Sequence, residues 1–181
     1  MNSRYHLWLK PSSRASDQFA GVIQQFALEL DAPTFDPHIT LLGNVNGSEA
    51  QHVASSNELA RRLRPFPINV SGPAFGENYF HCVFLVAEMT PPLLHAHALA
   101  CQIFHQERNS HYLPHLSLVY GRYSESRKKD IIAKLPASLY HPFEATHLSL
   151  IRAGSEDPKD WREVWMGMMG DGSEKREDNP G

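Results

Sequence analysis

The sequence predicts an α+β fold in which two similar lobes each combine an antiparallel sheet with backing helices. Two observations support this prediction. The first half of the chain reads strand, helix, strand, helix and further strands, and the second half repeats helix, strand, helix and strands. The pattern Pro-His-apolar-hydroxyl-Leu also occurs once in each half, at 37–41 and at 114–118. The length of 181 residues fits one such bilobal domain, which we expect to span residues 1–169.

The first half opens with an alternating strand over residues 5–9, in which His6 and Trp8 share one face and apolar residues occupy the other. Apolar residues then recur at spacings of three and four from Ser16 to Leu30, which predicts an amphipathic helix. Two prolines end this helix and force an extended approach to the first motif. After a turn-rich stretch, Ser48 begins a second helix that runs to about Arg64.

The later elements follow from the same rules. A strongly apolar stretch over residues 79–87 predicts a central strand, and a Pro-Pro pair begins a helix that runs from 91 to about 107. Ser124 is the expected N-cap of a helix that ends near residue 134. Shorter strand signals cover 66–70, 74–75, 143–152 and 161–168. Residues 170–181 lack apolar anchors, so we expect a disordered C-terminal tail.

Composition limits the classes of function. A hydrophobic content of 41% with 20% charged residues is typical of a folded globular chain, and no apolar run reaches membrane-spanning length. The formal net charge of −3 argues against broad attraction to nucleic acid, although it leaves room for a small anionic ligand. The N-terminus has no signal-peptide pattern, so we expect a cytoplasmic location, with the nucleus as the alternative. For the oligomeric state, a monomer is the default expectation. Cys82 and Cys101 are read as buried small hydrophobes rather than a disulfide.

The duplicated motif indicates the chemistry. Side chains alternate along a strand, so His38 and Thr40 should share one face, as should His115 and Ser117. An imidazole titrates near pH 6.5, so one histidine can act as a base while its partner acts as an acid. Hydrolysis of a cyclic phosphodiester needs both roles, and the two hydroxyls would donate hydrogen bonds to the phosphate oxygens.

Other histidines are assigned structural roles. His95 and His97 lie two apart on a predicted helix, which places them on nearly opposite faces and disfavours chelation of one metal. His147 begins a third tetrapeptide of the pattern His-apolar-hydroxyl-Leu, but it lacks the preceding proline and has no counterpart in the repeat, so we assign it to a structural strand. No zinc-binding pattern is present in the sequence, so we expect no metal and no other cofactor.

At these motifs the chain resembles the 2H phosphoesterase superfamily and, within it, the cyclic phosphodiesterases of the plant and fungal type. The resemblance covers about residues 4–168 and includes Trp8, the strand at 79–85 and Trp161 in the same order. It implies two lobes related by a pseudo-twofold axis through a central cleft. It also implies metal-independent hydrolysis of ADP-ribose 1″,2″-cyclic phosphate to ADP-ribose 1″-phosphate, and of nucleoside 2′,3′-cyclic phosphates to 2′-phosphates.

The resemblance also implies residue roles. His38 and His115 become the catalytic pair, Thr40 and Ser117 the phosphate binders, and Tyr120 a ligand contact. Two readings of Trp8 stay open, stacking on a base or ribose and packing between the lobes, and the sequence does not decide which histidine is the base. Arg4 and Arg152 are interpreted as exposed surface arginines, and the alternative is that they add positive potential to the site.

Two other functions stay open. One is an RNA-end processing enzyme, similar to a 2′-5′ RNA ligase or a 3′-exonuclease, whose partner would be short RNA ends. The other is a nucleotide-binding module without turnover. The acidic net charge favours a small cyclic-phosphate nucleotide as the substrate.

Overall fold

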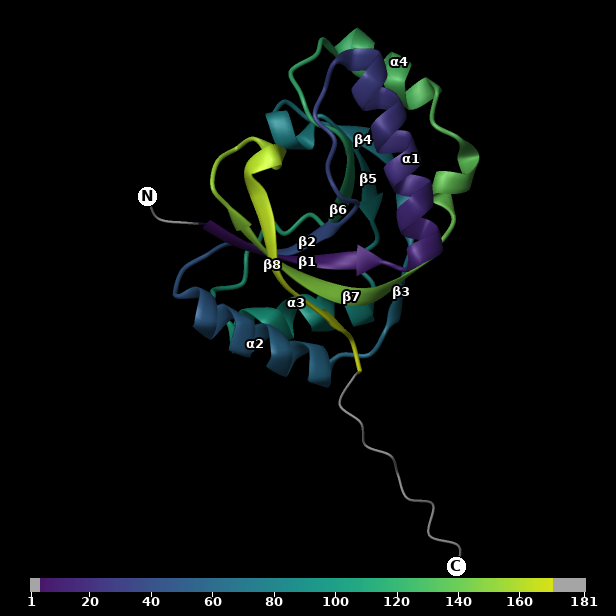
Figure 1. Ribbon diagram of the computed structural model, residues 1–181. Helices are drawn as coiled ribbons and strands as arrows, with labels where there is room; N and C mark the ends of the chain where they lie inside the picture. The colour runs from purple at the N-terminus through teal and green to yellow at the C-terminus, as the bar shows by residue number, and fades with distance from the viewer. Residues whose placement is uncertain (1–3, 171–181) are drawn as a thin grey trace, which may run out of the picture.

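The computed structural model describes residues 4–170, and these form one continuous, mostly linear path of strands flanked by helices (Figure 1). The strand order is β3-β7-β1-β2-β6-β5-β4, and β8 pairs with β7 beside β3. All pairs are antiparallel. The strands are β1 Arg4–Pro11, β2 Ile39–Val45, β3 Phe66–Ile68, β4 Val70–Phe75, β5 Val83–Ala87, β6 His115–Val119, β7 Phe143–Ala153 and β8 Trp161–Met168.

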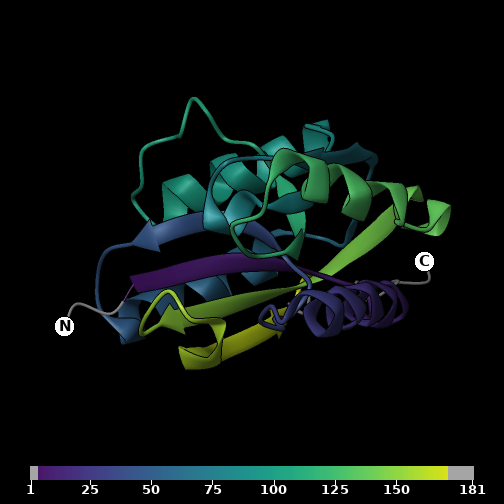
Figure 2. The ribbon, with the colours of Figure 1, turned by 90° about the horizontal axis from the view of Figure 1, so that it is seen from above.

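The strand order confirms the predicted α+β fold with two related lobes. In one lobe β2 pairs with β1, and β1 with β7; in the other, β6 pairs with β5, and β5 with β4. The lobes meet where the two motif strands touch, through the single register pair Ile39 and Leu116. Figure 2 shows β1 lying between β2 and β7, as the register requires. The pseudo-twofold axis therefore passes between the two motifs.

The helices follow the same symmetry. They are α1 Ser13–Leu30, α2 Glu49–Arg62, α3 Pro91–Ile103 and α4 Glu125–Ala133. Helix α1 contacts β6 of the opposite lobe and α3 contacts β2, while α4 packs on β4 and β5 and α2 on β7 and β8. Helices α1 and α4 lie together on one side of the molecule, and α2 and α3 lie together on the other (Figure 1). Glu29 joins the first pair through ion pairs with Arg127 and Lys134.

Most predicted boundaries agree with the structure to within a few residues, but the prediction of a strand over 79–87 is partly wrong. Its first residues, Tyr79–His81, form a turn of 3-10 helix, and β5 begins only at Val83. Tertiary hydrogen bonds account for the difference, because the amide of Gly121 donates to the carbonyl of Tyr79 and the amide of Gly76 to that of His81. Helix α3 also ends at Ile103, before the expected 107, since His105 has a φ of 52°.

The core lies between the strands and the helices. Leu7, Leu59, Leu93 and Leu148 are fully buried there. Both cysteines are buried free thiols, as predicted. None of the helices within residues 4–170 is long and apolar enough to cross a membrane. Of the expected tail, only Gly170 lies in the described part of the chain, where its amide donates to the carbonyl of Ala60; residues 171–181 lie outside it.

Candidate active site

The two motifs face one cavity of about 390 Å³ at the junction of the lobes. His38 and Thr40 line it from one lobe, and His115 and Ser117 line it from the other. The alternate residues of both motifs, Ile39, Leu41, Leu116 and Leu118, are each 1% exposed and belong to the core. The cavity is lined by Arg4, His6, Trp8, His38, Thr40, Gly43, Asn44, Phe80, His81, His115, Ser117, Tyr120, Ala153, Ser155, Glu156 and Trp161.

Both motif histidines are held in the same way. Nδ1 of His38 lies 2.7 Å from the carbonyl oxygen of Asp36, and Nδ1 of His115 lies 2.8 Å from that of Leu113. A carbonyl oxygen only accepts, so each Nδ1 carries the proton and each Nε2 keeps its lone pair. The bonded carbonyl lies two residues before each histidine, across the motif proline. This arrangement explains why the proline belongs to both motifs, since its fixed φ shapes the turn that carries the carbonyl.

Each motif strand contains a β-bulge directly after the hydroxyl residue. In β2 the register steps from Thr40 to Leu42 while β1 steps from Trp8 to Leu7, so Leu41 is the extra residue. In β6 the register steps from Ser117 to Val119 while β5 steps from Phe84 to Val83, so Leu118 is the extra residue. Bulges bend a strand and redirect its side chains. The bulges occupy equivalent places in the two motifs, which extends the pseudo-symmetry to the backbone.

An aromatic side chain from the neighbouring strand flanks each histidine. Trp8 pairs in register with Thr40 and stacks on His38, with ring centroids 3.5 Å apart and planes 8° apart. Phe84 pairs in register with Ser117 and meets the ring of His115 edge-on at 5.1 Å. Trp8 is 5% exposed and one face of its indole is covered by His38. Trp8 therefore packs against the imidazole while still contributing to the cavity wall.

The environment favours neutral imidazoles in the ligand-free site. Burial lowers the pKa of His38 to about 3, and the positive charge of Lys10 and the His115 imidazole act in the same direction. Burial also lowers the pKa of His115, with a further contribution from His81. The hydrogen bonds from Nδ1 to the backbone carbonyls oppose these shifts without cancelling them. At neutral pH both Nε2 atoms are therefore available as proton acceptors.

The remaining predicted residues also line the cavity. The hydroxyl of Ser117 donates to the carbonyl of Phe80 at 3.1 Å, so it must rotate to reach an anion in the cavity. Thr40 is partly buried, and its carbonyl accepts a hydrogen bond from the hydroxyl of Tyr112. Tyr120 is 3% exposed and stacks on Phe35 at 3.8 Å, and burial raises its pKa.

Sequence reasoning missed several residues of the cavity wall. His6 and Arg4 reach it from β1, and the alternation with Trp8 was the available signal, because all three share one strand face. His81 lies 4.5 Å from His115 between ring centroids, and no local signal could reveal it because its place depends on the 3-10 turn. Trp161 lines the cavity and contacts Trp8 edge-on. Arg4 was interpreted as an exposed surface arginine, with a contribution of positive potential as the alternative.

The histidines assigned structural roles lie away from the cavity. His147 is on β7, where its Nδ1 lies 2.9 Å from the hydroxyl of Thr146. His97 is buried, stacks on Tyr112 and donates from Nδ1 to the carbonyl of Leu41, while His95 is exposed. Arg152 is exposed and forms an ion pair with Glu49. Within residues 4–170, no group of three His, Cys, Asp or Glu side chains could hold a metal ion.

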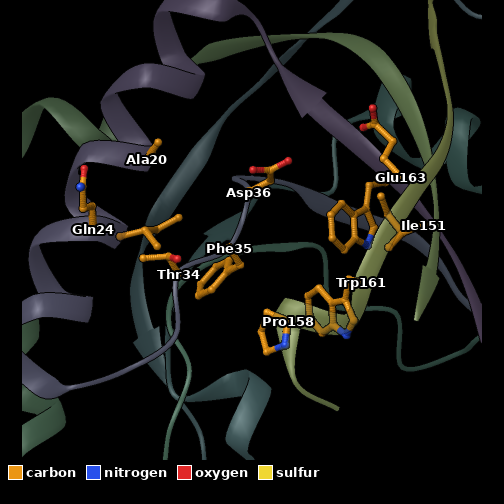
Figure 3. A pocket seen from close by; sticks show the side chains of 11 residues that line it. Ala20, Gln24, Thr34, Phe35, Asp36, Ile151, Pro158, Trp161 and Glu163 are labelled. Atoms are coloured by element: carbon orange, nitrogen blue, oxygen red, sulfur yellow. The ribbon is translucent and has the colours of Figure 1, made fainter. Parts of the chain in front are cut away.

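A neighbouring pocket of about 460 Å³ lies on the far side of Trp8 and Trp161. Figure 3 shows Trp161 and Ile151 on one side of this pocket and Gln24 of α1 on the other. Its charged wall residues are the acids Asp36 and Glu163, without any lysine or arginine. An anion is therefore better accommodated in the cavity that holds the histidines.

The bilobal fold and the paired motifs together define a phosphoesterase of the 2H class. The chain belongs to the 2′-5′ RNA ligase superfamily, whose family model matches residues 11–157. It is 28% identical over 159 residues to a cyclic phosphodiesterase of Arabidopsis thaliana, which covers 84% of this chain and 87% of that protein. It is also 33% identical over 96 residues to a 2′,3′-cyclic-nucleotide 3′-phosphodiesterase of Yarrowia lipolytica, covering 49% of this chain and 44% of the relative.

Solved structures share the fold. The apo form of E. coli LigT has a TM-score of 0.62 at 14% identity, with 92% of this chain and 97% of that chain covered. Its complex with 3′-AMP has a TM-score of 0.59 at 11% identity, with 93% and 99% covered. At these identities the likeness concerns the fold. With the family model and the curated relatives, it places the chain among cyclic phosphodiesterase-like hydrolases of the 2H class.

Proposed function

We propose that this protein hydrolyses cyclic phosphodiesters on small nucleotides by a metal-independent mechanism with two histidines. The substrates would be ADP-ribose 1″,2″-cyclic phosphate, opened to ADP-ribose 1″-phosphate, and nucleoside 2′,3′-cyclic phosphates, opened to 2′-phosphates. The observation that best supports the proposal is the matched pair of imidazoles in one cavity, each with its Nδ1 proton donated to the backbone and its Nε2 left free.

The two roles follow from the different burial of the histidines. Burial lowers the pKa of His38 to about 3, so this imidazole is neutral across the physiological range and its Nε2 is free to accept a proton, and we assign it as the general base. His115 is less buried, and a phosphate bound beside it favours its protonated form, so it suits the general acid. Nε2 of His38 would take a proton from water as the water oxygen attacks phosphorus. Nε2 of His115 would give a proton to the departing ribose oxygen as the P–O bond breaks.

The comparisons support a small nucleotide as the substrate. The relatives from Arabidopsis thaliana and Yarrowia lipolytica are named for cyclic phosphodiester hydrolysis. Structures of E. coli LigT with this fold were determined in complex with 3′-AMP, NADP+ and ATP. The net charge of −3 also disfavours a long nucleic acid strand.

The proposal is tested by incubating the purified protein with adenosine 2′,3′-cyclic phosphate in the presence of excess EDTA. We expect adenosine 2′-phosphate as the product, at the same rate as without the chelator, because proton transfer needs only the imidazoles. If EDTA abolished turnover and added Mg²⁺ or Mn²⁺ restored it, the metal-independent mechanism would be contradicted. Binding without any turnover would favour the nucleotide-binding module instead.

Removal of either motif hydroxyl should lower kcat/KM less than removal of a motif histidine. We expect Thr40→Val and Ser117→Ala to lower kcat/KM by about one to two orders of magnitude each, because a hydrogen bond to a charged group is worth about 1.5–3 kcal/mol. Steady-state kinetics on the cyclic nucleotide measures this. Ser149→Ala is the matched control, since Ser149 occupies the same place in the third tetrapeptide but bonds to Glu163. An equal loss in Ser149→Ala would show that the effect is structural.

A further inference from the structure

One end of the active-site cavity carries positive charge that the two-histidine mechanism does not use. Arg4, His6 and Trp8 alternate along β1 and all line the cavity. Trp8 stacks on His38 and so marks the place of the cyclic phosphate. Residues two apart on one strand face are separated by about 6.8 Å, so His6 lies one such step from Trp8 and Arg4 lies two.

The strand opposite His6 has an irregular register there, and its residues at that place also line the cavity. The register between β1 and β2 steps from Tyr5 and Val45 to Leu7 and Leu42, so Gly43 and Asn44 together oppose His6. A Cβ atom on Gly43 would lie 3.6 Å from Nδ1 of His6, in ordinary van der Waals contact, which places the backbone of Gly43 directly beside this imidazole. Asn44, with a φ of 54°, also lines the cavity and has an amide that donates hydrogen bonds.

The charges at this end suit an anion. Arg4 is the one lysine or arginine among the residues that line the cavity. Within residues 4–170 no carboxylate lies within ion-pair distance of its guanidinium, whereas Arg152 on the adjacent strand is paired with Glu49. Burial and the charge of Arg4 lower the pKa of His6, and a bound anion would offset both effects. Glu156 is the acidic residue of the cavity wall.

We propose that Arg4, His6 and the bulge at Gly43–Asn44 form a subsite for a second phosphate. That phosphate would be carried on the 5′ carbon of the ribose whose cyclic phosphate lies between His38 and His115. One ribose ring separates the two phosphates in such a ligand, and the row on β1 leads away from Trp8 in steps of similar size. The proposal rests on the proposed function and narrows its substrates to nucleotides with a 5′-phosphate or 5′-diphosphate, as in the cyclic phosphate of ADP-ribose.

The test compares adenosine 2′,3′-cyclic phosphate with its 5′-phosphorylated form. We expect the wild-type protein to have the higher kcat/KM for the 5′-phosphorylated substrate. Arg4→Ala should reduce the ratio of the two kcat/KM values by about five- to tenfold, because charge-assisted hydrogen bonds to phosphate are among the strong ones. The ratio isolates the second phosphate, since any effect on the shared part of the substrates cancels. The preference should also shrink at high salt.

Two further variants set the controls. Arg152→Ala removes an equal charge from the adjacent strand, at a residue that pairs with Tyr5 in register, and should leave the ratio unchanged. Glu156→Gln removes the opposing charge and should raise the ratio. A ratio of one in the wild-type protein, or equal changes in Arg4→Ala and Arg152→Ala, would overturn the subsite. Failure to hydrolyse either substrate would instead contradict the proposed function, so the two failures are distinct.

The same phosphate also occurs in RNA that ends in a 2′,3′-cyclic phosphate, where it is a diester with one negative charge. A dinucleotide with a cyclic end and ADP-ribose 1″,2″-cyclic phosphate are therefore included in the comparison. Relative to adenosine 2′,3′-cyclic phosphate, we expect kcat/KM to rise more for the ADP-ribose compound and the 5′-monophosphate than for the dinucleotide. A 5′-monoester carries more negative charge than a diester, and the diphosphate of ADP-ribose offers two charged phosphates to the subsite. A larger gain for the dinucleotide would overturn the assignment to small nucleotides in favour of RNA ends.

Discussion

Replacing His38 or His115 with asparagine is expected to lower kcat for cyclic phosphodiester hydrolysis by about 10²–10⁴-fold in each case. Asparagine can still place a donor near the position of Nδ1 and so keep the bond to the carbonyl of Asp36 or Leu113. It has no counterpart of Nε2, which is the atom that the mechanism requires. The measurement is steady-state kinetics on adenosine 2′,3′-cyclic phosphate, with circular dichroism to verify the fold.

The matched control is His147→Asn, which makes the same change in the third tetrapeptide of the pattern His-apolar-hydroxyl-Leu. His147 bonds to Thr146 on β7 and does not line the cavity, so this variant should keep its rate. If His147→Asn lost as much activity as the motif variants, the assignment of the catalytic pair would be wrong. Retention of full activity in either motif variant would contradict the two-histidine mechanism directly.

The same variants separate the base from the acid. A diester with p-nitrophenolate as its leaving group needs no proton on departure, so the general acid contributes little to its hydrolysis. We expect His115→Asn to recover much of its lost rate on such a substrate while His38→Asn stays impaired. The reverse result would exchange the two roles. The sequence alone could not assign them, because the motifs are nearly equivalent; the structure differs in placing His38 deeper, beneath Trp8.

Local patterns predicted most of the fold because they report on local physics. The strand at 161–168 has the expected bounds, and Ser48 begins α2 with a capping box that includes Gln51. The motif proline, histidine and hydroxyl also act locally, since the bond from Nδ1 reaches a carbonyl only two residues away. For this reason the motif side chains could be located from the sequence.

What the sequence could not predict depends on contacts between distant segments. The 3-10 turn at Tyr79–His81 is held by Gly76 and Gly121, and it brings His81 beside His115. The apolar composition of that stretch suits a strand equally well. Alternation over residues 5–9 placed His6 on the face of Trp8, and the structure extends this face to Arg4. Whether that face met a cavity depended on how the two lobes join.

The burial of His38 should also make the protein sensitive to acid. The unfolded imidazole titrates near pH 6.5, whereas burial lowers the folded pKa of His38 to about 3. Because the folded pKa is the lower one, the unfolded state binds a proton first, and the stabilising contribution is fully present above pH 6.5. It is lost as the pH falls from 6.5 towards 3. Between pH 6.5 and pH 4.5 this single group should lower the free energy of unfolding by about 2.3 kcal/mol, because the unfolded imidazole is already half protonated at pH 6.5.

Urea denaturation at the two pH values measures this loss. His6, His52, His81 and His115 also have pKa values lowered by burial, so the wild-type protein should lose more than His38 alone explains. The difference between the wild-type protein and His38→Asn isolates the single group, because asparagine does not titrate. His95→Asn is the control, since the imidazole of His95 is exposed to solvent in both the folded and the unfolded protein. This variant should lose as much stability between the two pH values as the wild-type protein. Equal losses in the wild-type protein and His38→Asn would mean that burial does not lower the pKa of folded His38, which would contradict both the stability argument and the assignment of His38 as the base that is neutral before turnover.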